Sequence, residues 1–202
     1  MLDVYVSYEY VQKLPVVILD NLYNQDEIVK LKKECHYLHD KLLDPQETHG
    51  AKKDGKLLKK NSGIYLENFF ADVTQSSIFQ TTRKVFSKSF VDMLTEIDVF
   101  FQYYARLNKD NTLLSYYENS DYYDSHADTA IFTICTWLFD EPKKFKGGDF
   151  FVKDLEIECK NNRTVIFPSV LQHGVTPLIM SDNEKGSING RFTISQFGTI
   201  VF

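Results

Sequence analysis

Two residues with metal-binding side chains lie two positions apart in the stretch DYYDSHADTA, where His126 precedes Asp128. On a β-strand, residues i and i+2 project from the same face of the sheet. An imidazole and a carboxylate placed in this way chelate a metal ion if a third ligand reaches them from elsewhere in the chain. The spacing also fits a histidine and an aspartate without a common role, so the interpretation depends on the third ligand.

His173 is the candidate for that third ligand. The chain has five histidines, and the three others lie in its N-terminal half. His173 follows the strand-like segment RTVIFPS, and several predicted strands separate it from Asp128, so an antiparallel barrel can return it to the same opening. Two histidines and one carboxylate with open positions left over suit a non-haem Fe(II) oxygenase. Taken alone, His173 also fits a hydrogen-bonded loop residue.

The last predicted strand supplies a cation and two hydroxyl groups on one face. In NGRFTISQF, Arg191, Thr193 and Ser195 alternate with apolar residues. Arg191 is able to hold a carboxylate with two parallel hydrogen bonds, helped by a hydroxyl from Thr193 or Ser195. The alternative is a half-exposed strand whose polar side faces water.

Taken together, these motifs resemble the Fe(II)- and 2-oxoglutarate-dependent dioxygenases, and among them the prolyl 4-hydroxylase-like branch. The resemblance covers about residues 112–200 and depends on the order and spacing of several motifs. They are Tyr117, Tyr123, His126 and Asp128, then Gly147-Gly148-Asp149, Phe167-Pro168, His173-Gly174-Val175-Thr176-Pro177 and Gly190-Arg191.

The chain departs from the family pattern in two places. Ser120 stands where the family prefers glycine, so the turn before the first ligands is expected to differ. The segment between His173 and Arg191 is longer than usual, and Lys185 lies nearer the customary distance. Lys185 is therefore a rival to Arg191 as the residue that anchors 2-oxoglutarate, although its run DNEKGS is turn-like.

The resemblance implies a mostly β, α+β protein with a double-stranded β-helix of the jelly-roll or cupin type. It implies that His126, Asp128 and His173 bind Fe(II), and that Arg191 and Thr193 bind the far carboxylate of 2-oxoglutarate. Other expected pocket residues are Tyr117, which reaches the co-substrate in the family, and Thr133 and Trp137. Core packing is the alternative for all three, and it is the role that we favour for Trp137.

The resemblance also implies an oxidative decarboxylation of 2-oxoglutarate to succinate and CO2, with O2 as oxidant and ascorbate as an accompanying reductant. The substrate we expect is a prolyl residue of a peptide or protein. The polar, lysine-rich stretch 44–62 is typical of a solvated loop, and the resemblance implies that it is a lid over the substrate. Other interpretations stay open: a cupin-type metal-binding protein without turnover, an oxygenase of nucleic acid, or an oxygenase of a free amino acid.

The elements that must position these residues change along the chain. Apolar residues at three- and four-residue steps predict helices over 21–42 and 76–95, and PVVIL (15–19) predicts a strand. On the first helix, His36 and His39 are neighbours, and we interpret them as surface residues beside the apolar stripe. From residue 97 onward the apolar period is two.

We therefore predict one domain over 1–202, with helical support in 1–96 and the β-core in 97–202. The expected strands are 98–107, 112–118, 129–139, 149–154, 157–161, 163–169 and 191–202.

Composition excludes several classes of protein. The 43% hydrophobic and 14% aromatic content predicts a globular chain, and the net charge of −5 disfavours broad contact with nucleic acid. No apolar run approaches the length of about 20 residues that a membrane-spanning helix needs. The three cysteines are widely spaced, and the N-terminus lacks a signal-peptide pattern. We therefore expect free thiols and a cytoplasmic protein.

Overall fold

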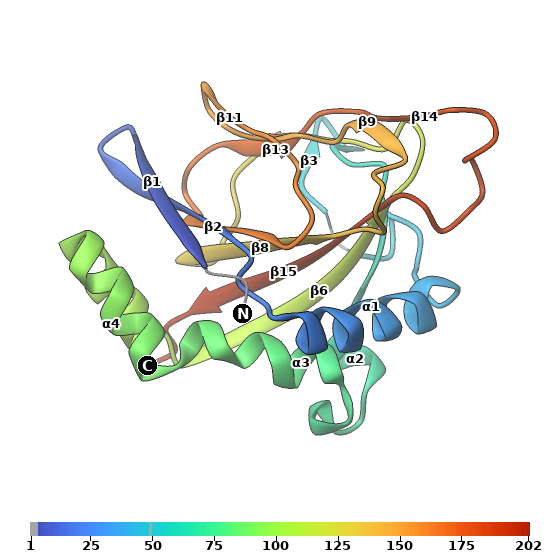
Figure 1. The fold of residues 1–202 in the computed structure, drawn as a ribbon. Coiled ribbons are helices and arrows are strands. Elements are labelled where there is room, and N and C mark those ends of the chain that lie inside the picture. Colours follow the sequence, from blue (N-terminus) through green and yellow to red (C-terminus); the bar gives the residue numbers. More distant parts are fainter. Residues whose placement is uncertain (1–3, 49) are drawn as a thin grey trace.

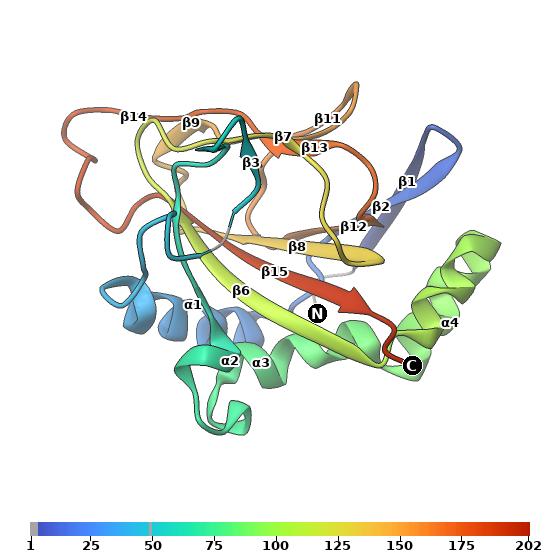
Figure 2. The ribbon, with the colours of Figure 1, turned by 180° about the vertical axis from the view of Figure 1, so that it is seen from behind.

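Two facing antiparallel sheets and a layer of helices make up the computed structural model, which describes residues 4–48 and 50–202. The smaller sheet lies above the larger one in Figure 1, and the helices lie below it. Figure 2 shows the same layers from behind. The two sheets form a double-stranded β-helix supported by N-terminal helices, so the predicted fold class is confirmed.

The larger sheet has seven strands. Their spatial order is β1 (Tyr5–Val11), β2 (Leu14–Asp20), β12 (Arg163–Pro168), β8 (Phe132–Leu138), β15 (Arg191–Thr199), β6 (Lys109–Tyr117) and β5 (Ser62–Tyr65). The smaller sheet has the order β11 (Leu155–Ile157), β10 (Phe150–Val152), β13 (His173–Val175) and β7 (Tyr123–His126). Two short pairs complete the strands: β9 (Phe145–Gly147) with β14 (Leu178–Met180), and β3 (Lys52–Lys53) with β4 (Lys56–Leu57).

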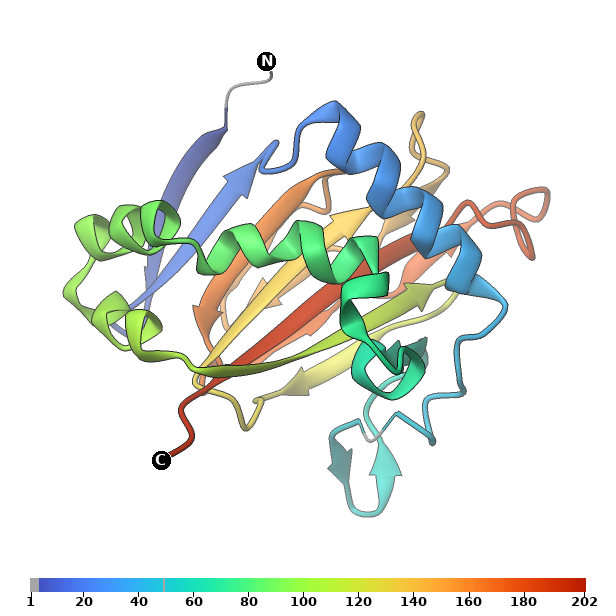
Figure 3. The same cartoon turned by 90° about the horizontal axis from the view of Figure 1, so that it is seen from below.

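The helices cover the outer face of the larger sheet, as Figure 3 shows from below. They are α1 (Gln25–His39), α2 (Leu66–Phe69), α3 (Ser77–Thr82) and α4 (Lys88–Ile97), with 3₁₀ turns η1 (Val73–Gln75), η2 (Arg83–Phe86), η3 (Val99–Gln102) and η4 (Tyr104–Arg106). Among the described residues, no helix is long and apolar enough to cross a membrane.

Helix α1 confirms the first predicted helix. Asn24 and Glu27 form a capping box at its start, in which each side chain accepts a hydrogen bond from the other residue's backbone N–H. The apolar stripe is buried against the sheet. His36 lies 3.5 Å from Asp140, and the ring of His39 packs edge-on against Tyr116, with 4.6 Å between their centroids. Both histidines thus pack between the helix and the outer face of the sheet.

The region 76–107 corrects two predictions. The second helix is broken at Ser87, whose backbone is extended, so α3 and α4 are separate. The predicted strand 98–107 is wrong, because 3₁₀ turns occupy most of it. The Asp98 side chain caps the first turn by accepting from the N–H of Phe100 at 2.7 Å. Phe101 and Tyr104, three residues apart, then both pack on Phe132. The C-terminal group of core strands begins at β6, at residue 109 rather than 97. Strands β1, β2 and β5 join the same sheet from the segment 1–96, which is therefore not helical support alone.

The predicted strands 112–118, 129–139, 149–154, 163–169 and 191–202 are present with shifted ends. The predicted strand 157–161 is wrong except for Ile157, because β11 ends there and residues 158–162 connect it to β12. The loop 44–62 contains the exposed β3–β4 hairpin and then leads into β5. Its lysines are exposed except for Lys59, of which only 5% is accessible. The β3–β4 hairpin is therefore solvated, whereas Lys59 and Asn61 in the segment that follows it are buried.

The turn before β7 has the backbone geometry that glycine favours. Ser120 has a φ of 68°, in the left-handed region where a side chain costs roughly 1–2 kcal/mol. Its N–H donates to the Leu178 carbonyl at 2.7 Å, which keeps the turn in place. Ser120 thus adopts the backbone conformation that glycine favours, although it carries a side chain.

Replacement of Ser120 tests this strain. We expect Ser120→Gly to be more stable than Ser120→Ala by about 0.5–1 kcal/mol, because the positive φ outweighs the greater unfolded-state entropy of glycine. Both variants lose the hydroxyl, so the comparison isolates the backbone. The same pair at Ser89, in helix α4, should show the opposite order. Urea denaturation measures all four variants, and equal stabilities at Ser120 would contradict the strained turn.

Candidate metal centre and co-substrate pocket

The three predicted ligands meet between the two sheets. His126 ends β7 and His173 begins β13, and these residues are direct partners in the smaller sheet. Asp128 lies just beyond β7, where its N–H donates to the Ser169 carbonyl at 3.0 Å. Nε2 of His173 lies 3.3 Å and Nε2 of His126 3.6 Å from the Asp128 carboxylate. One ligand atom from each residue lies within 4.8 Å of the others.

The two imidazoles are oriented in the same way. Nδ1 of His126 is 2.8 Å from the Asp124 carbonyl, and Nδ1 of His173 is 2.8 Å from the Leu171 carbonyl. A carbonyl oxygen only accepts, so each Nδ1 carries a proton and Nε2 is the nitrogen that is left for a metal ion. In both rings Nε2 is the nitrogen that faces Asp128. A hydrogen bond from Nδ1 to a backbone carbonyl is the contact that orients a histidine ligand at a metal site.

Burial sets the charge state of the cluster. It lowers the pKa of His126 to about 4, with the neighbouring His173 acting in the same direction. Burial alone would raise the pKa of Asp128, but the hydrogen bond and charge of His173 and the hydrogen bond of Thr133 outweigh it and lower that pKa. At neutral pH the site therefore holds a carboxylate and a neutral His126.

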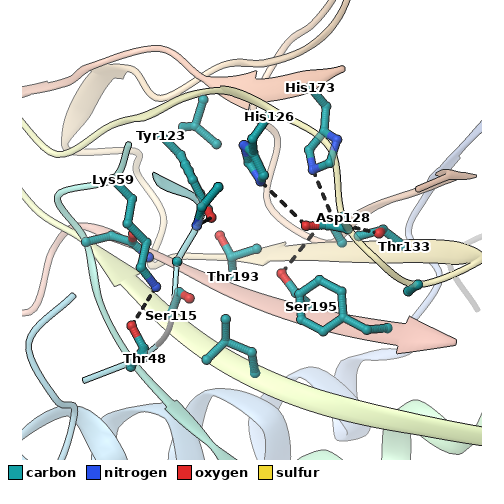
Figure 4. Close-up of a pocket in the computed structure, with 18 of the residues that line it drawn as sticks. Thr48, Lys59, Ser115, Tyr123, His126, Asp128, Thr133, His173, Thr193 and Ser195 are labelled. Atoms are coloured by element: carbon teal, nitrogen blue, oxygen red, sulfur yellow. Dashed lines mark hydrogen bonds and ion pairs between the residues drawn. The ribbon is translucent and has the colours of Figure 1, made fainter. Parts of the chain in front are cut away.

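Thr133 and Tyr123 hold the ligands in place. The Thr133 hydroxyl donates to Oδ2 of Asp128 at 2.7 Å, and the Tyr123 ring stacks on His126 with 3.6 Å between centroids. Figure 4 shows Asp128 between the two histidines, with Thr133 beside it. Thr133 was expected to line the pocket; it does so, with its hydroxyl on Asp128.

Arg191 is a charged side chain that the fold buries near the ligand cluster. It is fully inaccessible and lines a cavity of about 570 Å³ that also contains the ligand cluster. Its guanidinium carbon lies 4.3 Å from the centroid of the Tyr117 ring, and Nη1 donates to the Gly148 carbonyl. Gly147 and Gly148 have φ values of 64° and 67°, so the Gly-Gly turn brings that carbonyl to Arg191.

Several buried donors at and beside Arg191 have no hydrogen-bond partner among the described residues. They are Nε and Nη2 of Arg191, Oγ1 of Thr193 and Nε1 of Trp137. Thr193 pairs directly with Trp137 across the sheet, so these groups are neighbours. A buried unpaired donor costs about 1–3 kcal/mol, and four in one place fit an anionic ligand such as a carboxylate.

Trp137 is a pocket residue that sequence reasoning assigned to packing. Trp137 lies four residues after Thr133 in β8, so both side chains project from the inner face of that strand. This even spacing is the sequence pattern that could have placed Trp137 in the pocket. Lys185 lies elsewhere: it is exposed, is 2.5 Å from Asp182, and does not line the cavity. Of the two candidate anchors, the geometry thus brings Arg191 to the pocket.

The cavity follows the inner face of β6 and β15. Alternate residues of both strands line it, and they become more exposed from Arg191 and Tyr117 toward Lys109 and Val201. Strand β15 spans nine residues, or roughly 30 Å at about 3.3 Å per residue. The cavity is therefore closed at Arg191 and open at the other end of the strand.

The Thr133 contact offers a test of the metal centre. Thr133→Val removes the hydroxyl that orients Asp128 and keeps the side-chain shape. We expect it to weaken binding of Co(II) by about 10- to 100-fold, as loss of a supporting hydrogen bond does at other metal sites.

Thr136→Val is the matched control. Thr136 lies on the same strand as Thr133 but faces the other side of the sheet, where its hydroxyl contacts that of Thr164 in β12. Calorimetric titration of Co(II) into both folded variants provides the measurement. Equal affinities would mean that Thr133 does not position the ligand.

Comparisons with known proteins agree with this geometry. Residues 112–194 match the family model of the 2OG-Fe(II) oxygenase superfamily. No curated protein sequence matches the chain significantly.

Solved structures share the fold at low sequence identity. A Pseudomonas putida prolyl-4-hydroxylase is 14% identical, with a TM-score of 0.58 and 93% of each chain covered. A Burkholderia pseudomallei oxidoreductase of the 2OG-Fe(II) oxygenase family is 10% identical, with a TM-score of 0.55 and coverage of 91% of this chain and 85% of that one. EctD from S. alaskensis, solved with 2-oxoglutarate and 5-hydroxyectoine, has 10% identity, a TM-score of 0.55 and coverage of 91% and 72%.

The ligand cluster, Arg191 and the neighbouring Tyr117, Trp137 and Thr193 all lie within the matched segment. The part of the chain that carries the site therefore matches the family model of the 2OG-Fe(II) oxygenase superfamily.

Proposed function

We propose that the protein is an Fe(II)- and 2-oxoglutarate-dependent dioxygenase that hydroxylates a prolyl residue of a peptide or protein. His126, Asp128 and His173 are the proposed Fe(II) ligands, and Arg191 and Thr193 the proposed anchor of 2-oxoglutarate. The cluster of unpaired donors around Arg191 is the observation that carries the co-substrate assignment. The positive charge of Arg191 is opposite to that of a carboxylate, and the unpaired donors can each donate a hydrogen bond to the carboxylate oxygens.

The overall reaction couples two oxidations. 2-Oxoglutarate and O2 give succinate and CO2, and the second oxygen atom enters a C–H bond of the substrate as a hydroxyl group. Bound Fe(II) supplies the oxygen chemistry, with ascorbate as a reductant that restores the ferrous state. The protein's own residues orient the reactants: Arg191 fixes one end of the co-substrate, and Thr133 and the two backbone carbonyls fix the ligands.

Tyr117 contributes through its position. Its ring lies against the Arg191 guanidinium and is almost fully buried. Burial raises the pKa of its hydroxyl, so Tyr117 stays neutral and is able to donate a hydrogen bond to a carboxylate. We assign it to the co-substrate pocket on this basis.

The long open groove supports a peptide substrate. Its walls are the inner faces of two extended strands, and the co-substrate anchor lies at the closed end. Thr133, which holds Asp128, pairs with Phe197 in β15, so the metal centre lies between Arg191 and the open end. A segment of extended chain reaches the metal from that end without displacing the co-substrate. The fold shared with a bacterial prolyl-4-hydroxylase adds support for proline.

The loop that follows α1 closes one side of the groove. The Ala51 N–H donates to the Tyr123 hydroxyl at 2.9 Å, and the Asp124 N–H donates to the Leu58 carbonyl at 2.7 Å. The segment is thus attached to the strand that carries His126, while the β3–β4 hairpin projects into solvent. We assign the hairpin to contacts with a macromolecular substrate. The three buried free thiols fit a reducing compartment such as the cytoplasm.

A product screen with a hairpin variant tests the proposal. Proline-containing peptides, free L-proline and other free amino acids are incubated with protein, Fe(II), 2-oxoglutarate, ascorbate and air. We expect a mass gain of one oxygen atom on a proline peptide, with one succinate formed for each hydroxylation. Replacement of 52–57 by Gly-Gly should lower kcat/KM for that peptide about tenfold or more and leave half-saturation by 2-oxoglutarate unchanged, because the hairpin contacts neither ligand cluster nor anchor.

Shortening of the exposed turn 182–187 is the control, since it lies outside the cavity lining. A parallel loss of peptide turnover and 2-oxoglutarate binding would indicate misfolding of the hairpin variant. Oxidation of a free amino acid and of no peptide would contradict a peptide substrate.

A further inference from the structure

A buried lysine faces the cavity from the lid segment and has no carboxylate partner among the described residues. Lys59 is 5% exposed, and its Nζ donates to Oγ1 of Thr48 at 2.5 Å. Figure 4 shows the two side chains meeting on the side of the pocket away from the ligand cluster. Burying a lysine is costly unless its charge is compensated, so the position calls for an explanation.

The lysine is held in a defined orientation. A Cβ atom on Gly50 would lie 2.5 Å from Cε of Lys59, so the glycine leaves room for the lysine stem. Thr48 donates its own proton to the Pro45 carbonyl at 3.3 Å, which leaves its oxygen to accept from Lys59. An ammonium group has three donors, and Thr48 uses only one of them.

Asn61 adds a second incompletely paired group to the same wall. It is 1% exposed and lines the cavity, and its Oδ1 has no hydrogen-bond partner in the part of the chain that the structure describes. Burial also lowers the pKa of Lys59 to about 8, without any opposing effect from a nearby anion. The lysine is thus still mostly protonated at neutral pH and lacks a counter-ion.

The charges of the proposed reactants leave Lys59 unpaired. Asp128 is the one carboxylate that lines the cavity within residues 4–48 and 50–202. Its negative charge and the two of 2-oxoglutarate balance the two positive charges of Fe(II) and that of Arg191. Both carboxylates of 2-oxoglutarate are then engaged, one at the metal and one at Arg191. Lys59 is the remaining buried cation.

We propose that Lys59, together with Thr48 and Asn61, forms a subsite that binds a carboxylate of the organic substrate. This inference rests on the proposed function and narrows its substrate to one that carries an acid. The carboxylate has two possible sources: an aspartate or glutamate next to the target residue of a peptide, or the acid group of a free amino acid. Lys59 is in this view a specificity-determining residue.

Matched pairs of acid and amide ligands distinguish these sources. The probes are proline peptides with Glu or Gln on either side of proline, and L-proline with L-prolinamide. Each is titrated anaerobically into the protein loaded with Fe(II) and 2-oxoglutarate, and turnover is followed by mass in air. In the wild type, at least one acid should bind about 10- to 100-fold more tightly than its amide, the usual effect of a buried charge pair.

Lys59→Met keeps the stem against Gly50 and removes the charge. It should abolish the preference for the acid over the amide and leave the affinity for the amide unchanged. The affinity for 2-oxoglutarate should stay within about twofold of the wild type. Lys59→Arg should retain part of the preference, and Lys60→Met, at the exposed neighbour, should retain all of it. Thermal unfolding of Lys59→Met should be unchanged or shifted upward, since a buried charge is removed.

The inference is overturned if no acid in the panel binds the wild type better than its amide. It is also overturned if Lys59→Met weakens the binding of 2-oxoglutarate as much as Arg191→Met does, because Lys59 would then be a binding residue for the co-substrate. Failure of the wild type to bind 2-oxoglutarate would count against the proposed function instead. Repeating the acid and amide titrations on the metal-loaded protein alone still decides the role of Lys59 in that case.

Discussion

The inner face of β6 and β15 carries buried polar side chains, and their burial costs free energy. Apolar packing in the rest of the structure must offset that cost. Arg191, Thr193 and Ser195 lie in one row along β15 and are nearly inaccessible. The rest of the larger sheet supplies apolar packing on both faces. On the inner face, Trp137 of β8 and Phe167 of β12 pack against Phe150 of the smaller sheet. The outer face is covered by α1, α3 and α4, whose apolar residues pack on Leu138, Phe192 and Ile134.

The same constraint explains how the two ends of the cavity differ. At the closed end, Arg191 is held by the Gly148 carbonyl and by the Tyr117 ring, with its remaining donors unpaired. At the ligand cluster, two backbone carbonyls fix the imidazole tautomers and Thr133 fixes the carboxylate. Contacts within the protein thus orient the side chains of both sites, and such orientation reduces the entropic cost of binding.

The chain order of the site was predictable because its residues lie on or beside regular strands. The i, i+2 alternation in RFTISQF placed Arg191 and Thr193 on one face, and β15 has that geometry. The alternation in DVFFQYYARL was misleading, because Asp98 caps a 3₁₀ turn and the aromatic residues pack at a three-residue step. The buried Lys59 was not predictable, since its burial depends on Gly50 and on pairing with β7, distant in sequence.

The measurement that decides whether this cavity is an oxygenase site is an anaerobic optical titration with Fe(II) followed by 2-oxoglutarate. Chelation of the metal by the keto acid should produce a weak visible charge-transfer band in the wild type. His173→Ala should abolish the band, and Arg191→Met should require a concentration of 2-oxoglutarate about 10- to 100-fold higher, because a buried charged hydrogen bond is lost. A folded wild type that binds Fe(II) and gives no band at saturating 2-oxoglutarate would contradict the assignment.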